Sequence, residues 1–317
     1  MIDKARLKLL LKLAVGLTLV ALLLSRIEVA ALVDALGSYT AGAFSAALAL
    51  TAASMLIAGL RWKVLVPHIG YMRLLRFTLI GQFYSLVLPG QITGDAVKAW
   101  RISRGVPDGA RTALSVLADR IAGLIALLLV CLAGIALSGD GLTRKLLPPV
   151  LVLTIGLIGS LLALQSSAVR NLLFALIDNL RRVRRGPPVA EKLSMLISSW
   201  TAATGDARAL LLSVMLGVVF QLIGVAIYAI LAACLSIDLD WTYWMWIAGV
   251  TAVALLLPVT LGGLGIREGT LVAILAHYGV PGEKAVALSL GLFALAVAVA
   301  ITGWMVDVAE LRASRTS

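Results

Sequence analysis

Long apolar runs constrain this sequence more than any other feature. Residues 112–137 and 209–235 are apolar almost throughout, without alternation of apolar and polar positions. A run of about 20 apolar residues can cross a bilayer as a helix, and a segment in lipid must satisfy its own backbone hydrogen bonds. The chain is 61% hydrophobic and 14% charged, whereas a soluble domain is about a quarter charged. The sequence therefore predicts an all-α polytopic membrane protein with about six to eight transmembrane helices.

Basic residues gather in a few short segments of the chain. Residues 1–12, 61–76, 95–111 and 170–192 carry net charges of +3, +4, +2 and +4, and the remainder carries −2. Lys and Arg concentrated in short loops mark the cytoplasmic side of a membrane protein. This distribution predicts a cytoplasmic (inner) membrane protein with both termini in the cytoplasm. It argues against nucleic-acid binding, which would need a basic domain.

The order of apolar runs and loops predicts one integral membrane domain, 1–317. Its first half is 1–166, a cytoplasmic amphipathic segment covers 167–207, and the second half is 208–317. Residues 8–25 lack a signal-peptide cleavage pattern and are expected to be an uncleaved first helix. The other expected crossings are 41–60, 112–137, 147–166, 209–235, 241–262 and 284–306. Residues 241–282 begin and end outside in this scheme, either as two full spans or as a hairpin.

Residues 77–93 are apolar but too short for a full span of about 20 residues. Basic segments lie on both sides, so a single crossing would place one of them outside, against the charge rule. The run therefore predicts a re-entrant hairpin that enters from the cytoplasm and breaks at Leu88, Pro89 and Gly90. Thr93 is expected to be the N-cap of the next helix, which ends at Gly105 and Pro107.

Residues 170–207 carry two apolar stripes at helical spacing, one from Leu172 to Leu180 and one from Leu193 to Trp200. Four arginines and a Gly-Pro-Pro sequence separate the stripes. Basic amphipathic helices of this kind lie on the inner leaflet, where anionic lipid attracts them. The alternative is a solvated loop.

Two helix-breaking sequences occupy corresponding positions in the two halves. They are LVLPGQITGDAVKAW at 86–100 and LLLPVTLGGLGIREG at 255–269, with Pro89 and Pro258 separated by 169 residues. The first opens from the cytoplasm, and by charge parity the second opens from outside. Paired interruptions of this kind indicate an inverted-repeat transporter with its binding site at the breaks.

Charged residues within apolar runs mark the candidate site. Each costs about 2.5–3.5 kcal/mol near the bilayer centre. Arg267 carries a planar donor suited to phosphate, next to helix amides that favour anions. Glu268 either holds Arg267 or handles a proton. The predicted substrate-binding residues are Gln82, Tyr84, Gln91, Asp95, Lys98, Arg101, Asp119, Arg120, Gly263, Gly265, Arg267 and Glu268, and the predicted hinge residues are Pro89, Gly90, Gly94, Pro258 and Gly262.

No metal site or cofactor is expected from the sequence. His68 and His277 have no partners at ligand spacing, and Cys131 and Cys234 lie in apolar runs as expected free thiols. No nucleotide-binding motif of the Walker type occurs, so we expect no ATP hydrolysis by this chain.

Four segments resemble the transmembrane (flippase-like) family of lysylphosphatidylglycerol synthase. They are RWKVL at 61–65, LPGQITGDAVKAW at 88–100, ALSVLADRIAGLIAL at 113–127 and LPVTLGGLGIREG at 257–269. The chain has Gly94-Asp95 where family members more often have Gly-Glu. The resemblance implies movement of a lipid, a lipid-linked saccharide or an aminoacyl-lipid between leaflets. The synthases add a soluble aminoacyl-transfer domain, and we expect that activity to be absent here.

Three functions follow from these patterns. The leading hypothesis is a flippase for an anionic phospholipid, an aminoacyl-lipid or a lipid-linked saccharide. The alternative is a non-transporting membrane partner that recruits a glycosyltransferase or lipid synthase of the cell envelope. A lipid-modifying enzyme would need a nucleophile or a metal, and the sequence suggests neither, so we expect no enzymatic activity. The oligomeric state is not predicted.

Overall fold

The computed structural model describes residues 28–88, 92–103, 109–181, 187–256 and 262–316, and these residues contain helices but no strands. Five helices are long and apolar enough to cross a membrane. They are α3 (Ala41–Leu65), α6 (Gly109–Ser138), α7 (Gly141–Gln165), α10 (Ala207–Cys234) and α13 (Gly282–Thr316). The all-α membrane fold is thus confirmed. The predicted first helix, 8–25, lies outside the described residues.

The long helices cover the predicted crossings, with shifted ends. α3 continues to Leu65, past the predicted end at residue 60, and carries Arg61 and Trp62 within the helix. α7 begins at Gly141, earlier than the predicted residue 147, because Asp140 caps it by accepting a hydrogen bond from Thr143 N at 2.7 Å. Between the predicted crossings 8–25 and 41–60, the chain forms α2 (Val29–Gly37).

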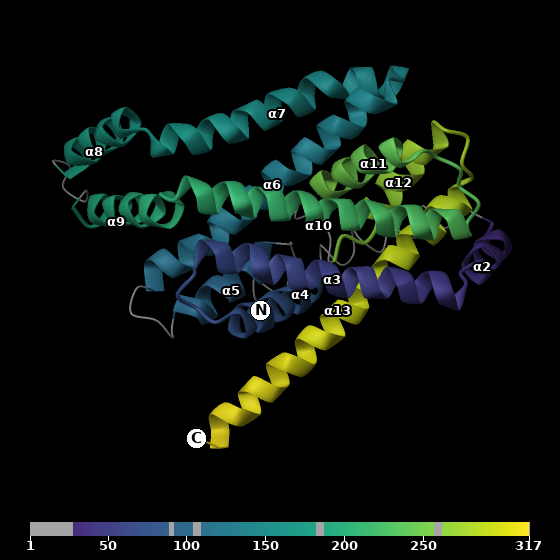
Figure 1. Cartoon of the computed structure of the whole chain (residues 1–317), viewed down its shortest axis with the longest axis horizontal. Coiled ribbons are helices and arrows are strands. Elements are labelled where there is room, and N and C mark those ends of the chain that lie inside the picture. The colour runs from purple at the N-terminus through teal and green to yellow at the C-terminus, as the bar shows by residue number, and fades with distance from the viewer. Residues whose placement is uncertain (1–27, 89–91, 104–108, 182–186, 257–261, 317) are drawn as a thin grey trace, which may run out of the picture.

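Four shorter helices form two pairs, one in each half of the chain. α4 (Tyr71–Val87) and α5 (Ile92–Ser103) pack against each other, as do α11 (Trp241–Ala254) and α12 (Ile266–Ala276). In Figure 1, α4 and α5 lie toward the end of the molecule that holds α9 (Pro187–Thr204), whereas α11 and α12 lie toward the end that holds α2. The two pairs therefore approach the middle of the molecule from opposite ends.

The ends of the short helices refine the sequence predictions. α11 stops at Ala254, so the predicted crossing 241–262 was too long. The chain after it turns through Gly262, Gly263 and Gly265, which have φ values of 59°, 77° and 85°. Positive φ is costly for residues with a Cβ, which explains why glycines occupy this turn before α12. α5 runs from Ile92 to Ser103, so Thr93 lies inside the helix and the prediction of Thr93 as its N-cap was wrong.

Several predicted features fall where the structure gives no description. The hinge residues Pro89, Gly90 and Pro258, the site residue Gln91, and the helix stop at Gly105 and Pro107 lie outside the described residues.

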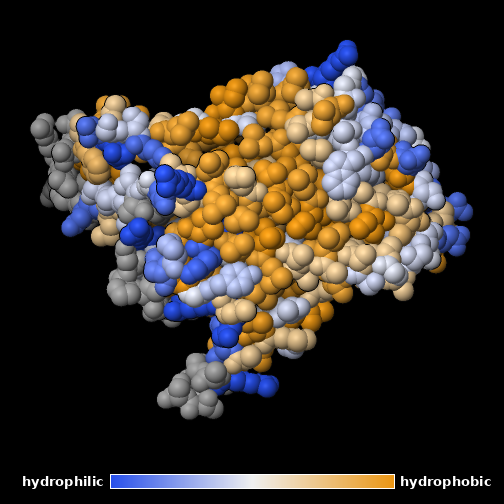
Figure 2. All heavy atoms as spheres, viewed as in Figure 1, coloured by the Kyte–Doolittle hydropathy of each residue, from blue (hydrophilic) through white to orange (hydrophobic). Residues whose placement is uncertain are grey.

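The visible surface has the hydropathy expected of a membrane protein. Figure 2 shows apolar residues across the middle of the molecule and polar residues toward its two ends. α7 contributes exposed apolar side chains, including Val152, Ile155 and Leu162. A broad apolar exterior of this kind suits a lipid environment.

Both predicted amphipathic segments are helices, namely α8 (Ser167–Arg181) and α9. α9 packs against α6 and α8, and Trp200 on α9 is buried with Leu65, Ala118 and Leu210. The apolar stripe on α9 therefore packs against the protein at Trp200. The proposed position of α8 and α9 on the inner leaflet stays a prediction.

Small residues let α11 pack closely against α6. A Cβ on Gly134 would lie 2.8 Å from Thr242 O, and a Cβ on Gly249 would lie 2.7 Å from Cys131 Cβ. Close backbone approach at small residues is a main source of helix association in membranes.

Substitution of Gly134 with Leu is expected to destabilise the protein by about 1–3 kcal/mol, the usual cost of overpacking. The added side chain would push α11 away from α6. Thermal unfolding in detergent measures the loss as a lower midpoint. Gly156→Leu on α7 is the control, because a Cβ there meets nothing within 4 Å. Equal midpoints for both variants would contradict the packing described.

Asp140 also links the two halves of the chain, because its second oxygen accepts a hydrogen bond from Tyr278 Oη at 2.5 Å. Partial burial by itself raises the pKa of Asp140, but hydrogen bonds from Thr143 and Tyr278 outweigh it and lower the pKa below its usual value. A carboxylate with a lowered folded pKa stabilises the fold above its unfolded pKa of about 3.9, and this stability is lost as the pH falls through the folded pKa.

Tyr278→Phe removes one of the groups that lower this pKa. We expect the unfolding midpoint of the wild type to fall more steeply than that of the variant between about pH 6 and about pH 3. Parallel pH profiles would show that the hydrogen bond adds nothing to stability.

Candidate functional site

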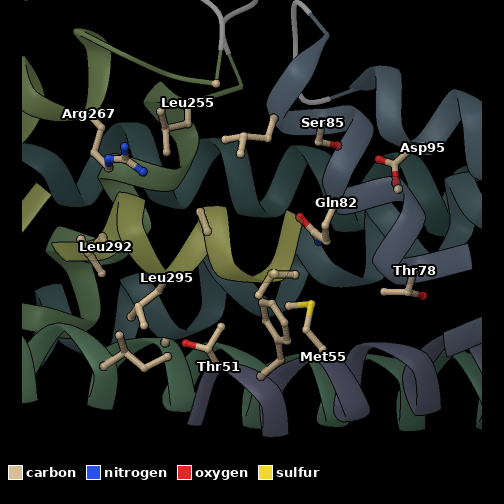
Figure 3. Close-up of a pocket in the computed structure, with 18 of the residues that line it drawn as sticks. Thr51, Met55, Thr78, Gln82, Ser85, Asp95, Leu255, Arg267, Leu292 and Leu295 are labelled. Carbon is tan, nitrogen blue, oxygen red and sulfur yellow. The ribbon is translucent and has the colours of Figure 1, made fainter. Parts of the chain in front are cut away.

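A cavity of about 370 Å³ lies between the two pairs of short helices. Its walls come from both halves of the chain, with Asp95 and Lys98 on α5, Arg120 on α6 and Arg267 on α12. Figure 3 shows Arg267 on one side of the cavity and Asp95 on the other, with Gln82 of α4 between them. Apolar residues complete the lining, including Met55, Phe220, Leu255, Leu292, Leu295 and Val299.

Glycines bring the backbone segments around the cavity into contact. A Cβ on Gly262 would lie 3.3 Å from Leu86 O, so the end of one short pair touches the turn of the other. Gly94 on α5 lies against Gly81 O and Ser85 Oγ on α4 with no room for a Cβ. The predicted hinge glycines Gly94 and Gly262 are therefore positions of close backbone approach, and Gly262 also lines the cavity.

The start of α12 is held by a chain of hydrogen bonds. Glu268 Oε2 accepts from the backbone N–H of Gly265 at 2.6 Å, and Glu268 Oε1 accepts from Ser289 Oγ at 2.7 Å. Ser289 Oγ in turn accepts from Arg267 Nε at 2.9 Å. The Arg267 Nη2 to Glu268 Oε1 distance is 3.6 Å, which makes an ion pair without a direct hydrogen bond. Ser289 therefore positions both charged side chains.

Arg267 has one donor group that no described atom accepts. Its side chain is buried and faces the cavity, and Nη2 has no hydrogen-bond partner among the described residues. Its guanidinium lies 5.2 Å from the Phe293 ring centroid. The sequence predicted an anion cradle from the α12 amides. Glu268 takes the Gly265 amide instead, so the guanidinium is the donor that a cavity anion would meet.

A second charged cluster lies at the other side of the cavity. Arg61 binds Asp119 through both carboxylate oxygens, at 2.7 and 3.0 Å. Arg120 Nη1 donates to Asp95 Oδ2 at 2.9 Å. Lys98 Nζ lies 3.6 Å from Asp95 Oδ1 and 4.0 Å from Asp119 Oδ2, with the Trp62 ring centroid at 4.6 Å. The predicted group Asp95, Lys98, Asp119 and Arg120 is thus brought together.

Two predicted site residues lie elsewhere. Tyr84 and Arg101 both bind Asp307 of α13, and Arg101 also contacts Glu310 at 3.3 Å. Neither is part of the cavity lining. They tie α4 and α5 to α13.

Sequence reasoning missed Arg61 and Ser289. Arg61 was assigned to a cytoplasmic loop, because it begins a basic segment directly after an apolar run. The signal for Ser289 was weak, since it is a single hydroxyl in the run AVALSLGL. Its role depends on contacts with α12, which local sequence does not reveal.

Gln82 lines the cavity, whereas Gly263 and Gly265 shape the turn before α12. Among the described residues, no three His, Cys, Asp or Glu side chains gather closely enough to bind a metal ion.

These features define a multi-pass helical membrane protein with a charged cavity between two short helix pairs. Residues 9–303 match the family described as the lysylphosphatidylglycerol synthase TM region, and the chain belongs to this family. Membership assigns it to the membrane proteins of lipid or envelope biosynthesis. No curated protein and no solved structure shows significant similarity to the chain.

Removal of one partner from the Arg61–Asp119 pair is expected to cost about 3–5 kcal/mol, because it leaves a buried charge uncompensated. Asp119→Leu alone should therefore lower the unfolding midpoint strongly. The double variant Arg61→Leu with Asp119→Leu should recover much of the loss, because no unpaired partner remains. Thermal unfolding of the four proteins in detergent gives the coupling, and additive losses would show that the pair contributes no specific interaction.

Proposed function

We propose that this protein moves a lipid with an anionic headgroup between the leaflets of the cytoplasmic membrane. The candidate lipids are an anionic phospholipid, an aminoacyl-lipid and a lipid-linked saccharide. The observation that carries the proposal is the buried guanidinium of Arg267, which lines the cavity between the two short helix pairs and whose Nη2 has no hydrogen-bond partner among the described residues.

In this proposal, α4–α5 and α11–α12 are two re-entrant hairpins that enter the bilayer from opposite sides. Each of these helices has 11 to 17 residues, shorter than a full span of about 20. Their approach from opposite ends supports an inverted repeat, with the binding site where the interruptions meet.

The lipid's parts would occupy different surroundings. A charged headgroup is costly to place in hydrocarbon, so it would pass through the cavity and contact Arg267, Lys98 and Arg120. The apolar exterior would leave the acyl chains in the bilayer. A cavity of about 370 Å³ is at the small end of ligand pockets, which span about 300–1,000 Å³, and suits a headgroup rather than a whole lipid.

The orientation follows from charge. The corner between α3 and α4, with Lys63 in the last turn of α3 and Arg73 and Arg76 at the start of α4, would face the cytoplasm, together with α8, α9 and both termini. Asp238 and Asp240 would face outward. The chain itself would carry out transport without catalysis, and a cell-envelope synthase or glycosyltransferase would supply or use the lipid.

Purified protein in liposomes is expected to move a labelled anionic phospholipid from the inner to the outer leaflet. Arg267→Ala should slow the initial rate about tenfold or more, because a charge-assisted hydrogen bond contributes about 1.5–3 kcal/mol. Arg267→Lys should be intermediate, since it keeps the charge but loses the planar fork. The measurement is the accessibility of the label to a membrane-impermeant quencher over time.

Arg144→Ala is the matched control, because Arg144 is an exposed cation outside the cavity lining. It should move lipid at the wild-type rate. Equal rates in liposomes with and without protein, across anionic, aminoacylated and saccharide headgroups, would reject transport. That result would favour the non-transporting partner instead.

A further inference from the structure

Arg61 and Arg267 each lie beside a carboxylate, but only Arg61 is hydrogen-bonded to it directly. Arg61 donates from Nε and Nη2 to the two oxygens of Asp119, at 2.7 and 3.0 Å. Arg267 donates from Nε to Ser289 Oγ at 2.9 Å, and its Nη2 lies 3.6 Å from Glu268 Oε1, beyond hydrogen-bond distance. The Ser289 hydroxyl therefore stands where a carboxylate oxygen would complete the same two-point pair.

The Ser289 hydroxyl does not make the hydrogen bond that hydroxyls commonly make inside a helix. Such groups often donate to the carbonyl oxygen four residues earlier, as Thr51 does to Ala47 O at 2.8 Å. Ser289 instead reaches from α13 to α12, where it donates to Glu268 Oε1 at 2.7 Å and accepts from Arg267. Its side chain is buried, so water does not compete for either bond.

The gap between Arg267 Nη2 and Glu268 Oε1 is small enough to close. Glu268 stays in place because its other oxygen, Oε2, accepts from Gly265 N at 2.6 Å. Nη2 is buried without a hydrogen-bond partner among the described residues, which carries a free-energy cost that a direct contact would remove. A shift of about half an ångström would bring the two atoms into the usual N–H···O range of about 2.7–3.2 Å. Ser289 binds both side chains and so keeps the direct pair from forming.

We infer that Ser289 is a positioning residue for anion recognition, because it replaces a direct Arg267–Glu268 pair with a neutral bridge. The inference rests on the proposed function, in which Arg267 meets the headgroup. A direct pair would engage the fork of the guanidinium that suits a phosphate. The bridge instead leaves Arg267 in the cavity lining (Figure 3) with donor capacity that Glu268 has not taken.

Binding of phosphate-containing probes in detergent tests the inference apart from transport. The probes are short-chain phosphatidylglycerol and inorganic pyrophosphate, a lipid and a free phosphate with the same kind of acceptor oxygen. For each probe that the wild type binds, Ser289→Ala should raise the Kd about tenfold, as expected if the direct pair forms in about nine of ten molecules. Calorimetric titration measures the Kd. A wild type that binds neither probe would overturn the inference.

The double variant Ser289→Ala with Glu268→Gln separates positioning from a structural role. Glutamine can still accept from Gly265 N at the helix start, but it has no charge with which to hold Arg267. The double variant should therefore recover most of the affinity that Ser289→Ala loses. If Ser289 only supported packing, the second substitution would leave the loss unchanged or add to it. Either of those results would overturn the inference.

Ser213→Ala on α10 is the matched control. Ser213 is also a buried serine of a long apolar helix, but it is not part of the cavity lining, and its hydroxyl has no hydrogen-bond partner among the described residues. This variant should retain the wild-type Kd.

The outcomes distinguish the positioning role from transport. An unchanged Kd in Ser289→Ala would overturn the inference, even if the protein moves lipid in liposomes. Conversely, the predicted loss and recovery of binding without any lipid movement would reject transport and keep the positioning role of Ser289.

Discussion

The structure depends on how the ends of the two short helix pairs satisfy their backbones where they meet inside the protein. Buried backbone N–H and C=O groups need hydrogen-bond partners. Gly262 lies against Leu86, and the first turns of α12 are closed by Glu268 on Gly265 N and by hydrogen bonds from Arg267 N to Gly263 O and from Gly269 N to Gly265 O. The helix start is thus completed internally, and the Arg267 guanidinium is left to face the cavity.

Ion pairing lowers the free-energy cost of the buried charges, and the pairs differ in which helices they connect. The bidentate Arg61–Asp119 pair joins α3 to α6, and Arg101 with Asp307 joins α5 to α13. The first contact ties two long helices together, and the second ties the short helix α5 to α13. Around the cavity the pairing is incomplete, since Lys98 lies beyond hydrogen-bond distance of two carboxylates and Arg267 Nη2 has no hydrogen-bond partner within the part of the chain that the structure describes.

The positions of the long helices could be predicted from the sequence, because a membrane-spanning helix is recognised by the length and hydropathy of its apolar run. The five long helices follow from the apolar runs, and the Leu-Pro sequences followed by glycines located both interruptions. The residues that could not be assigned depend on contacts between distant segments. The sequence predicts Arg61 in a loop, whereas α3 continues past it. Ser289 acts through its contact with Arg267 of α12. Tyr84 and Arg101 contact Asp307, which lies more than 200 residues further along the chain (|i−j| of 223 and 206).

The central claim is that a lipid headgroup anion enters the cavity and meets Arg267. An experimentally determined structure with a bound phosphodiester lipid tests it most directly, with phosphorus located by its density. The account predicts the phosphate within hydrogen-bonding reach of the Arg267 guanidinium, in the cavity between the two pairs of short helices, with acyl chains outside the protein. A phosphate found only at the outer ends of the helices, with the cavity filled by hydrocarbon, would contradict it.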